Sequence, residues 1–282
     1  MKKINLNLGA LMAIGAFFCL FFGAFIEGAT AIPYKLIEKT ATSLIIAYLA
    51  FRMSFLETKK VGLFFLPLLT HSLIILLGLG RLKAGGLSEI FTLVTSLYRL
   101  LLILGYLFLV EFLLNKVIGS KATSVLGLIS LLVYLGLFYK KSQESFKEAY
   151  DMFLYFAFYV MAIRIRPATR VSPLLIGLSI LGFILEAYFY DRLPNYGLFI
   201  SAFPLSYLSL KTVKENESPA FRDYFLTSLI YTYPSLSVFI KAYLGFDLLA
   251  TMIIAILASY ILADLIYRLN IKNLSYIVLG IY

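Results

Sequence analysis

The sequence predicts an all-α fold, a polytopic bundle of about ten transmembrane helices with both termini in the cytoplasm. Hydrophobic residues make up 61% of the 282 residues and charged residues 14%, whereas a soluble domain has about 25% charged residues. The mean hydropathy is +0.92. Apolar runs of about 17–25 residues, each long enough for a helix to cross a hydrocarbon core of roughly 30 Å, recur from end to end. We therefore expect residues 1–282 to form a single integral domain of the cell membrane.

The apolar runs are separated by segments rich in Gly, Pro or charge, which are typical of loops. The first run follows MKKINLN and continues past Phe25 into EGATAIP without a small-residue cleavage pattern, so we expect it to be a retained span rather than a signal peptide. The sixth run is short. The spans are expected at about 7–26, 36–55, 61–80, 88–114, 122–139, 150–164, 171–190, 194–210, 224–243 and 247–268.

The basic residues of the loops predict the orientation. More of the loop Lys and Arg residues fall on the side of the N-terminus, and cytoplasmic loops are the ones that retain positive charge. The net charge of +10 is explained by this topology and by anionic lipid headgroups, since the basic residues lie between apolar runs. Membrane lipids are thus expected partners and nucleic acid is not. The oligomeric state is not indicated.

Several classes of site have no residues to support them. Cys19 is the only cysteine and lies in the first span, so the chain offers neither a disulfide framework nor a thiolate metal site. No metal site and no bound cofactor are expected. The sequence also has no GxSG, HExxH, Asp-rich or Walker motif, which disfavours membrane proteases, prenyltransferases and nucleotide-driven motors.

Two ionisable side chains fall at the same depth of consecutive spans. His71, the only histidine, lies midway along FFLPLLTHSLIILLGLG, and Arg99 lies midway along the next span. Because such a side chain costs about 2.5–3.5 kcal/mol at the bilayer centre, we expect both to line one polar cavity. His71 is the candidate catalytic base and Arg99 the candidate stabiliser of an oxyanion. Two structural interpretations stay open: an imidazole bonded to a helix backbone or a serine, and a guanidinium in an interhelical ion pair.

Further candidate substrate-binding residues lie near the ends of spans. The segment RIRPATR holds Arg164, Arg166 and Arg170 on the cytoplasmic side, and guanidinium groups bind phosphate oxygens in a bidentate manner. The segment is a candidate site for a phosphate or for the headgroup of an acyl carrier; an orientation signal is the alternative. Glu186, near the outer end of its span, is a candidate to bind sugar hydroxyls or to abstract a proton.

Two other charged groups are expected to have structural partners. Glu111 and Arg99 are separated along one helix by roughly 18 Å at 1.5 Å per residue, so each needs a different partner. Asp264 and Arg268 are four residues apart in the last span, which predicts an intrahelical ion pair.

Three stretches from about Tyr150 onward carry a resemblance to a known family: AYDMFLYFAFYVMAIRI, SPLLIGLSILGFILEAYFYDRLPNYGLFISAFPLSYLSL and, most clearly, FRDYFLTSLIYTYPSLSVFIKAYLGF. They resemble the acyltransferase-3 family, whose ten-span membrane enzymes acylate cell-surface polysaccharides, lipids and some antibiotics. In the last stretch, Ile230, Tyr231 and Pro234 match the family's Ser-x-x-IYL-x-HP pattern, with Tyr233 in place of the histidine and a spacing one residue shorter.

The resemblance implies acylation of a surface glycan or a lipid-linked substrate, with an acyl thioester as the donor if the protein is active and with Tyr231 and Tyr233 in contact with substrate. The family's catalytic histidine closes the first span after an arginine, and NLNLGALMAIGAFFCLFFGAFIEG contains neither residue. Two versions stay open: His71 replaces that histidine from another helix, or the scaffold persists without the reaction. Whether the protein is an enzyme is therefore uncertain from the sequence.

A function of another class is also compatible with the sequence. A transporter, flippase or export subunit would hold a polar solute of the cell envelope in the same polar cavity. Broken helices would support this alternative, because irregular backbone at membrane depth is found where it lines a cavity. The candidate breaks are Pro67, Pro173, Pro204 and Pro234.

Overall fold

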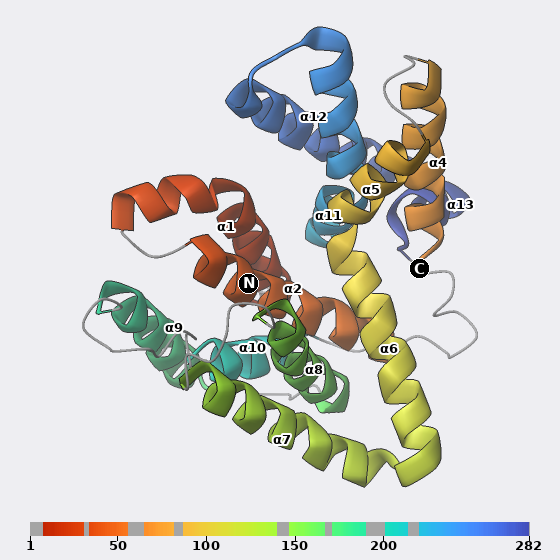
Figure 1. Cartoon of the computed structure of the whole chain (residues 1–282). Coiled ribbons are helices and arrows are strands. Elements are labelled where there is room, and N and C mark those ends of the chain that lie inside the picture. Colours follow the sequence, from red (N-terminus) through yellow and green to blue (C-terminus); the bar gives the residue numbers. More distant parts are fainter. Residues whose placement is uncertain are drawn as a thin grey trace, which may run out of the picture. The chain divides into compact units, whose positions relative to one another are not determined.

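The computed structural model describes residues 8–30, 34–55, 65–81, 87–139, 147–166, 171–189, 201–213 and 220–281. Within these ranges the chain is helical, with short turns and no β-strand, which confirms the all-α prediction. The helices group into two compact units (Figure 1). Unit 1 comprises Met1–Phe55 and Leu104–Asn216, and unit 2 comprises Leu56–Ile103 and Glu217–Tyr282. The single domain of 1–282 stays a prediction.

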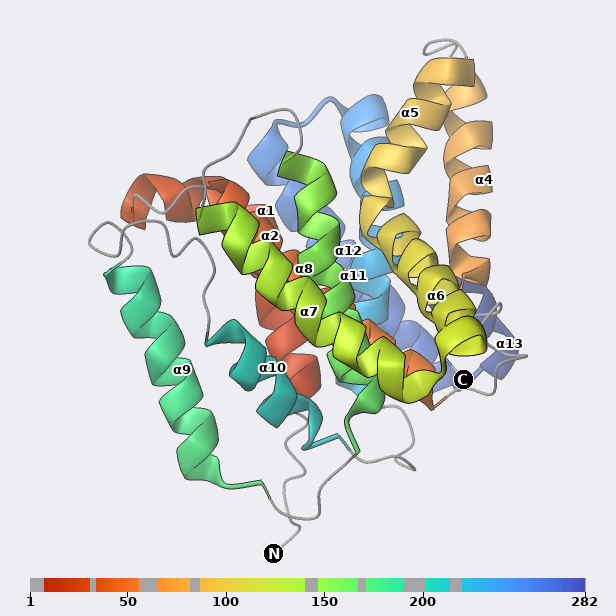
Figure 2. The same cartoon turned by 60° about the horizontal axis from the view of Figure 1, so that its bottom comes forward.

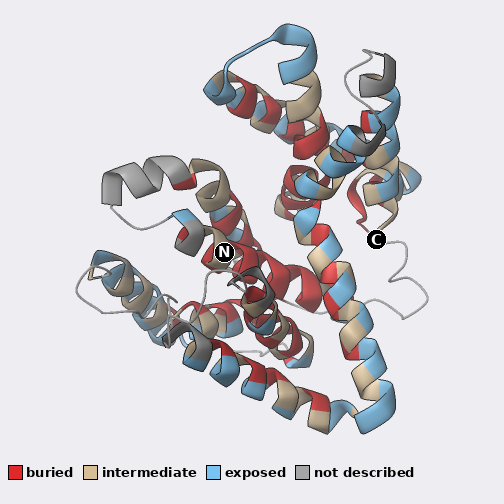
Figure 3. Ribbon diagram, viewed as in Figure 1, coloured by how far each residue is buried: buried red, intermediate tan, exposed pale blue. Residues whose placement is uncertain are grey.

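Unit 1 has α2 (Tyr34–Ser54) at its core. The helix is apolar on every side at its centre, and all its residues from Leu44 to Phe51 are buried. Figure 3 shows the middle of α2 in red, the colour of buried residues. A helix of this kind is typical of the interior of a bundle. Both α1 (Leu8–Thr30) and α8 (Lys147–Arg164) pack against it.

The remaining helices of unit 1 surround this core. α7 (Ser120–Tyr139) packs along α8, and the nine-residue α10 (Ala202–Leu210) contacts α1, α2, α8 and α9 (Pro173–Tyr188). The C-terminal part of α6 (Arg99–Ile118) turns into α7 at Gly119, whose φ of +83° is a conformation that glycine adopts without strain.

Unit 2 is organised by α11 (Phe221–Phe239). α12 (Leu248–Leu269) packs along it, and α4 (Leu66–Arg81) contacts it on another side. α5 (Leu87–Leu97) runs beside α4 (Figure 2). After Phe239, α11 continues into the π-helical turn Ile240–Leu244. The helical segment ends at Gly245, whose φ of +65° is a left-handed conformation.

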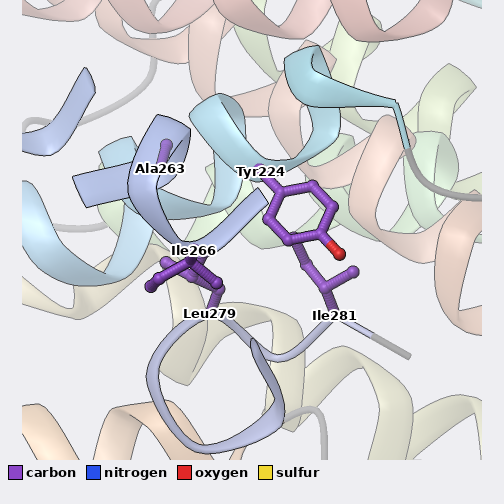
Figure 4. Packing of buried hydrophobic residues seen from close by; sticks show 5 residues of the cluster. All are labelled: Tyr224, Ala263, Ile266, Leu279 and Ile281. Atoms are coloured by element: carbon purple, nitrogen blue, oxygen red, sulfur yellow. The ribbon is translucent and has the colours of Figure 1, made fainter. Parts of the chain in front are cut away.

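The C-terminal segment of unit 2 follows α12. It contains the short α13 (Lys272–Leu274) and the π-helical turn Ser275–Leu279. Figure 4 shows how this segment is attached: Leu279 and Ile281 pack against Tyr224 of α11 and Ala263 and Ile266 of α12. This apolar cluster fixes the position of the last turn.

Two helices of the described residues are both long and apolar enough to cross a membrane, α6 and α12. Shorter apolar helical stretches cover Leu8–Gly23, Leu66–Gly78, Ser120–Gly136 and Pro173–Glu186. Helices thus occupy the predicted apolar runs, while the number of spans and the cytoplasmic termini stay predictions.

Two features of the helices differ from the expected ones. The run 88–114 forms two helices, because the chain makes a turn at Tyr98 and α6 then continues to Ile118. In the run 194–210, α10 ends at Leu210 as expected, and residues 194–200 lie outside the described part. The helical segment after α12 was not expected at all. Apolar periodicity shows where a helix is favoured, and it does not show a one-residue turn or a short terminal helix.

Candidate functional site

The buried face of α4 positions His71. Pro67, His71 and Ile75 are spaced four residues apart and are all buried, whereas Leu69 and Leu73 on other faces are exposed. Residues at i and i+4 lie on one side of a helix. His71, only 4% exposed, is therefore on the stripe by which α4 packs against the rest of unit 2.

Both ring nitrogens of His71 have protein partners. Nδ1 lies 3.1 Å from the hydroxyl oxygen of Ser235 on α11, and Nε2 lies 3.2 Å from the carbonyl oxygen of Val278 in the C-terminal segment. One side chain thus joins three elements that are far apart in the sequence. Of the interpretations open from the sequence, this arrangement is the imidazole bonded to a serine and to a helix backbone.

The chemistry of the partners assigns the hydrogen bonds. A carbonyl oxygen only accepts, so Nε2–H donates to Val278. In a neutral imidazole Nδ1 is then an acceptor and receives the Ser235 hydroxyl proton. The same hydroxyl lies 2.8 Å from the Thr232 carbonyl oxygen, to which it can also donate. One proton therefore faces two acceptors, and the ring competes for it with the backbone of α11.

The Val278 carbonyl is available because of its place in the chain. It belongs to the last turn of the helical segment, where carbonyl groups lack intrahelical donors. His71 supplies the missing donor. The neighbouring Leu279 belongs to the apolar cluster of Figure 4, which holds the carbonyl in place.

A second polar contact in the same unit connects the start of α6 to α11. The buried Tyr98 hydroxyl donates to the carbonyl oxygen of Tyr231 at 3.0 Å. Tyr231 and Tyr233 are themselves buried in α11. Pro234 has no N–H, so the Ile230 carbonyl one turn earlier loses its intrahelical donor.

Arg99, in contrast, is exposed at the first residue of α6. It belongs to unit 2, as His71 does. The ring nitrogens of His71 meet Ser235 and Val278. A cavity shared by the imidazole and the guanidinium stays a prediction.

In unit 1 the arginine segment begins in a polar cluster. Nη2 of Arg164 lies 3.2 Å from Oε1 of Glu111 and 3.0 Å from Oδ1 of Asn115, and the Asn115 amide donates to the same carboxylate oxygen. The predicted separate partner of Glu111 is thus Arg164. Arg166 is exposed, and Arg170 lies outside the described residues.

Glu186 has its carboxylate at the N-terminus of α10. Its oxygens accept from the Ser201 backbone N–H at 3.2 Å and from the Ser201 hydroxyl at 2.7 Å. Ser201 is the N-cap residue of α10, and a negative charge stabilises a helix at this end. Glu186 therefore ties α9 to α10; contact with a sugar hydroxyl stays a prediction.

The predicted pair of the last span is confirmed. Arg268 Nε lies 2.7 Å from Asp264 Oδ2 on the outside of α12.

Within the described part of the chain, no group of three or more His, Cys, Asp or Glu side chains is arranged to hold a metal ion.

Sequence reasoning missed Ser235, Val278 and Asn115. Asn115 is four residues from Glu111, a spacing that signals contact on a helix. Ser235 is a polar residue in an apolar run, which is a weaker signal. Val278 acts through its backbone, and no pattern in the sequence could indicate it.

No family model, no curated protein and no solved structure matches the chain.

Proposed function

We propose that this chain is a multi-pass integral membrane protein, with about ten spans and cytoplasmic termini, and that it acts on or near the acylation of cell-surface polysaccharide or lipid. In this proposal it is a member of the acyltransferase-3 type that retains the scaffold without catalysing transfer. The observation that supports the non-catalytic version most is the burial of His71, which is 4% exposed and whose two ring nitrogens lie against Ser235 and Val278, so that neither nitrogen faces a substrate in this structure.

The membrane location is supported by the exposure of the apolar helices. Only 22% of the apolar window of α6 and 33% of that of α12 are buried, whereas a core helix of a soluble protein is mostly buried. Leu73, Leu77, Val117 and Ile261 are among many large apolar side chains that are exposed. Such surface is stable against lipid tails and not against water.

Membrane insertion is tested by extraction and by labelling. The protein should stay in the membrane pellet at alkaline pH, and single cysteines placed in the loops of a Cys19→Ser background should react with an impermeant thiol reagent from alternate sides. Release of the protein at alkaline pH would refute a multi-pass location.

The acylation role is tested in cells that lack the protein. Acyl groups on the surface glycan and lipid should change when the chain is deleted, and a His71→Gln variant should restore them as the unchanged protein does. Loss of restoration in a folded His71→Gln variant would favour a catalytic base. No effect of the deletion on acylation would refute the role altogether.

A transporter, flippase or export subunit for a polar envelope solute is the second candidate, and one observation favours it. Pro234 lies inside α11, which then passes into the π-helical turn Ile240–Leu244. Irregular backbone of this kind is frequent at functional sites in membrane helices. Pro67, Pro173 and Pro204 lie in the first turns of α4, α9 and α10, where proline is tolerated, so they interrupt none of the described helices. Efflux or uptake of a solute that depends on Pro234 would favour this candidate.

A further inference from the structure

A groove of about 530 Å³ opens between α6, α7 and α8 in unit 1. Its volume falls within the range of about 300–1,000 Å³ that small ligands occupy. The walls are almost entirely apolar and include Leu107, Val110 and Leu114 of α6, Val133 of α7, and Phe153 and Phe156 of α8. A ligand segment that fits these walls is hydrocarbon.

The base of the groove is formed by α7 and α8, which pack against each other. The hydroxyl of Ser130, which lines the groove, donates to the Phe153 carbonyl at 2.8 Å, so its proton is already engaged within the protein. Further along, a Cβ on Gly127 would lie 2.8 Å from a Val160 methyl, so the two helices pack closely there. α6 leaves α7 at Gly119 and forms the opposite wall.

One end of this groove is basic. α6 ends, α7 begins and α8 ends on the same side, because Glu111 meets Arg164 and Gly127 meets Val160. The side chain of Arg164 is 36% exposed. A guanidinium has five N–H donors, and both contacts with Glu111 and Asn115 are made by the same nitrogen, Nη2. The other exposed cations on these helix ends are Lys116, Lys121 and Arg166.

We infer that the groove holds one acyl chain of an anionic phospholipid, with the lipid phosphate at Arg164. Charge complementarity selects the occupant. The groove is apolar and ends in several cations, and the one carboxylate there is buried and already paired with Arg164. Such a site matches a hydrocarbon tail with a negative headgroup. Basic clusters at the ends of membrane helices bind anionic lipid headgroups in this way. The inference rests on the proposed membrane location and does not depend on the acylation role.

The absence of tryptophan from the sequence provides a clean test. A Phe156→Trp variant places a single reporter in the groove, and a Leu181→Trp variant places a matched reporter on the exposed face of α9. Each is reconstituted in phosphatidylcholine vesicles that contain a small fraction of brominated phosphatidylglycerol or of brominated phosphatidylcholine, and quenching is measured. Tyr106→Trp is a second groove reporter if Phe156→Trp does not fold.

The groove reporter should reach half-maximal quenching at a roughly five- to tenfold lower fraction of the anionic lipid, the preference expected from one or two cationic contacts. The reporter on α9 should show no preference. Adding Arg164→Gln should abolish the preference of the groove reporter. Equal quenching by both lipids, or a preference that survives Arg164→Gln, would overturn the inference. Failure to insert into vesicles would overturn it together with the membrane location, which the alkaline extraction measures separately.

Discussion

Replacing Ser235 by alanine tests whether His71 is a structural tie. The change removes the hydroxyl that lies 3.1 Å from Nδ1 and leaves the buried ring nitrogen without that partner. An unsatisfied buried acceptor costs about 1–3 kcal/mol in soluble proteins. Interhelical side-chain bonds in membrane proteins average about 0.6 kcal/mol, with a maximum of about 1.7. We therefore expect the free energy of unfolding to fall by about 1 kcal/mol.

The chain provides a matched control on the same helix. The Ser237 hydroxyl donates to the Pro234 carbonyl at 2.8 Å, within α11 itself. Ser237→Ala thus removes a serine hydroxyl without breaking a contact to α4, and its effect should stay within about 0.5 kcal/mol. Unfolding is followed by circular dichroism in mixed micelles with increasing denaturing detergent.

A double-mutant cycle then isolates the pair. His71→Leu and Ser235→Ala should together cost less than the sum of the two single changes, with a coupling of at least about 0.5 kcal/mol. Zero coupling, or equal effects of Ser235→Ala and Ser237→Ala, would refute the structural role.

Two further pairs of changes test the ion pairs and the helix packing of the units. Lys39 Nζ lies 2.7 Å from Asp151 Oδ1, and the two side chains are only 18% and 11% exposed. Lys39→Met should therefore lower the free energy of unfolding by about 3 kcal/mol in the same detergent titration. Asp264→Asn, in the more exposed pair of α12, should lower it by less than about 1 kcal/mol. Gly78→Ala would place a Cβ 2.1 Å from a phenylalanine ring of α11 and should lower the melting temperature, whereas Gly136→Ala, with nothing within 4 Å, should raise it by improving helix propensity. Equal effects within either set would contradict the contacts described.

The site could be predicted only in part. The position of His71 in the middle of an apolar run indicated a buried polar residue. The i,i+4 spacing predicted the Asp264–Arg268 pair. Both signals could be used because each depends on a single helix. The partners of His71 could not be predicted, since Ser235 and Val278 lie 164 and 207 residues away. Equal depth in two spans suggested Arg99 as a neighbour, but depth alone does not say which face of a helix a residue occupies.

Composition and apolar run length determined the fold class of this protein, since a chain so rich in hydrocarbon side chains favours helices that satisfy their own backbone. They also placed most helices along the chain. Only the tertiary structure decided what the polar residues do: Glu186 caps α10, Arg164 closes a cluster with Glu111, and His71 reaches a carbonyl of the C-terminal turn. The physical reason is that a buried polar group is stabilised by whichever partner folding brings within hydrogen-bond distance, and that partner is set by packing between helices.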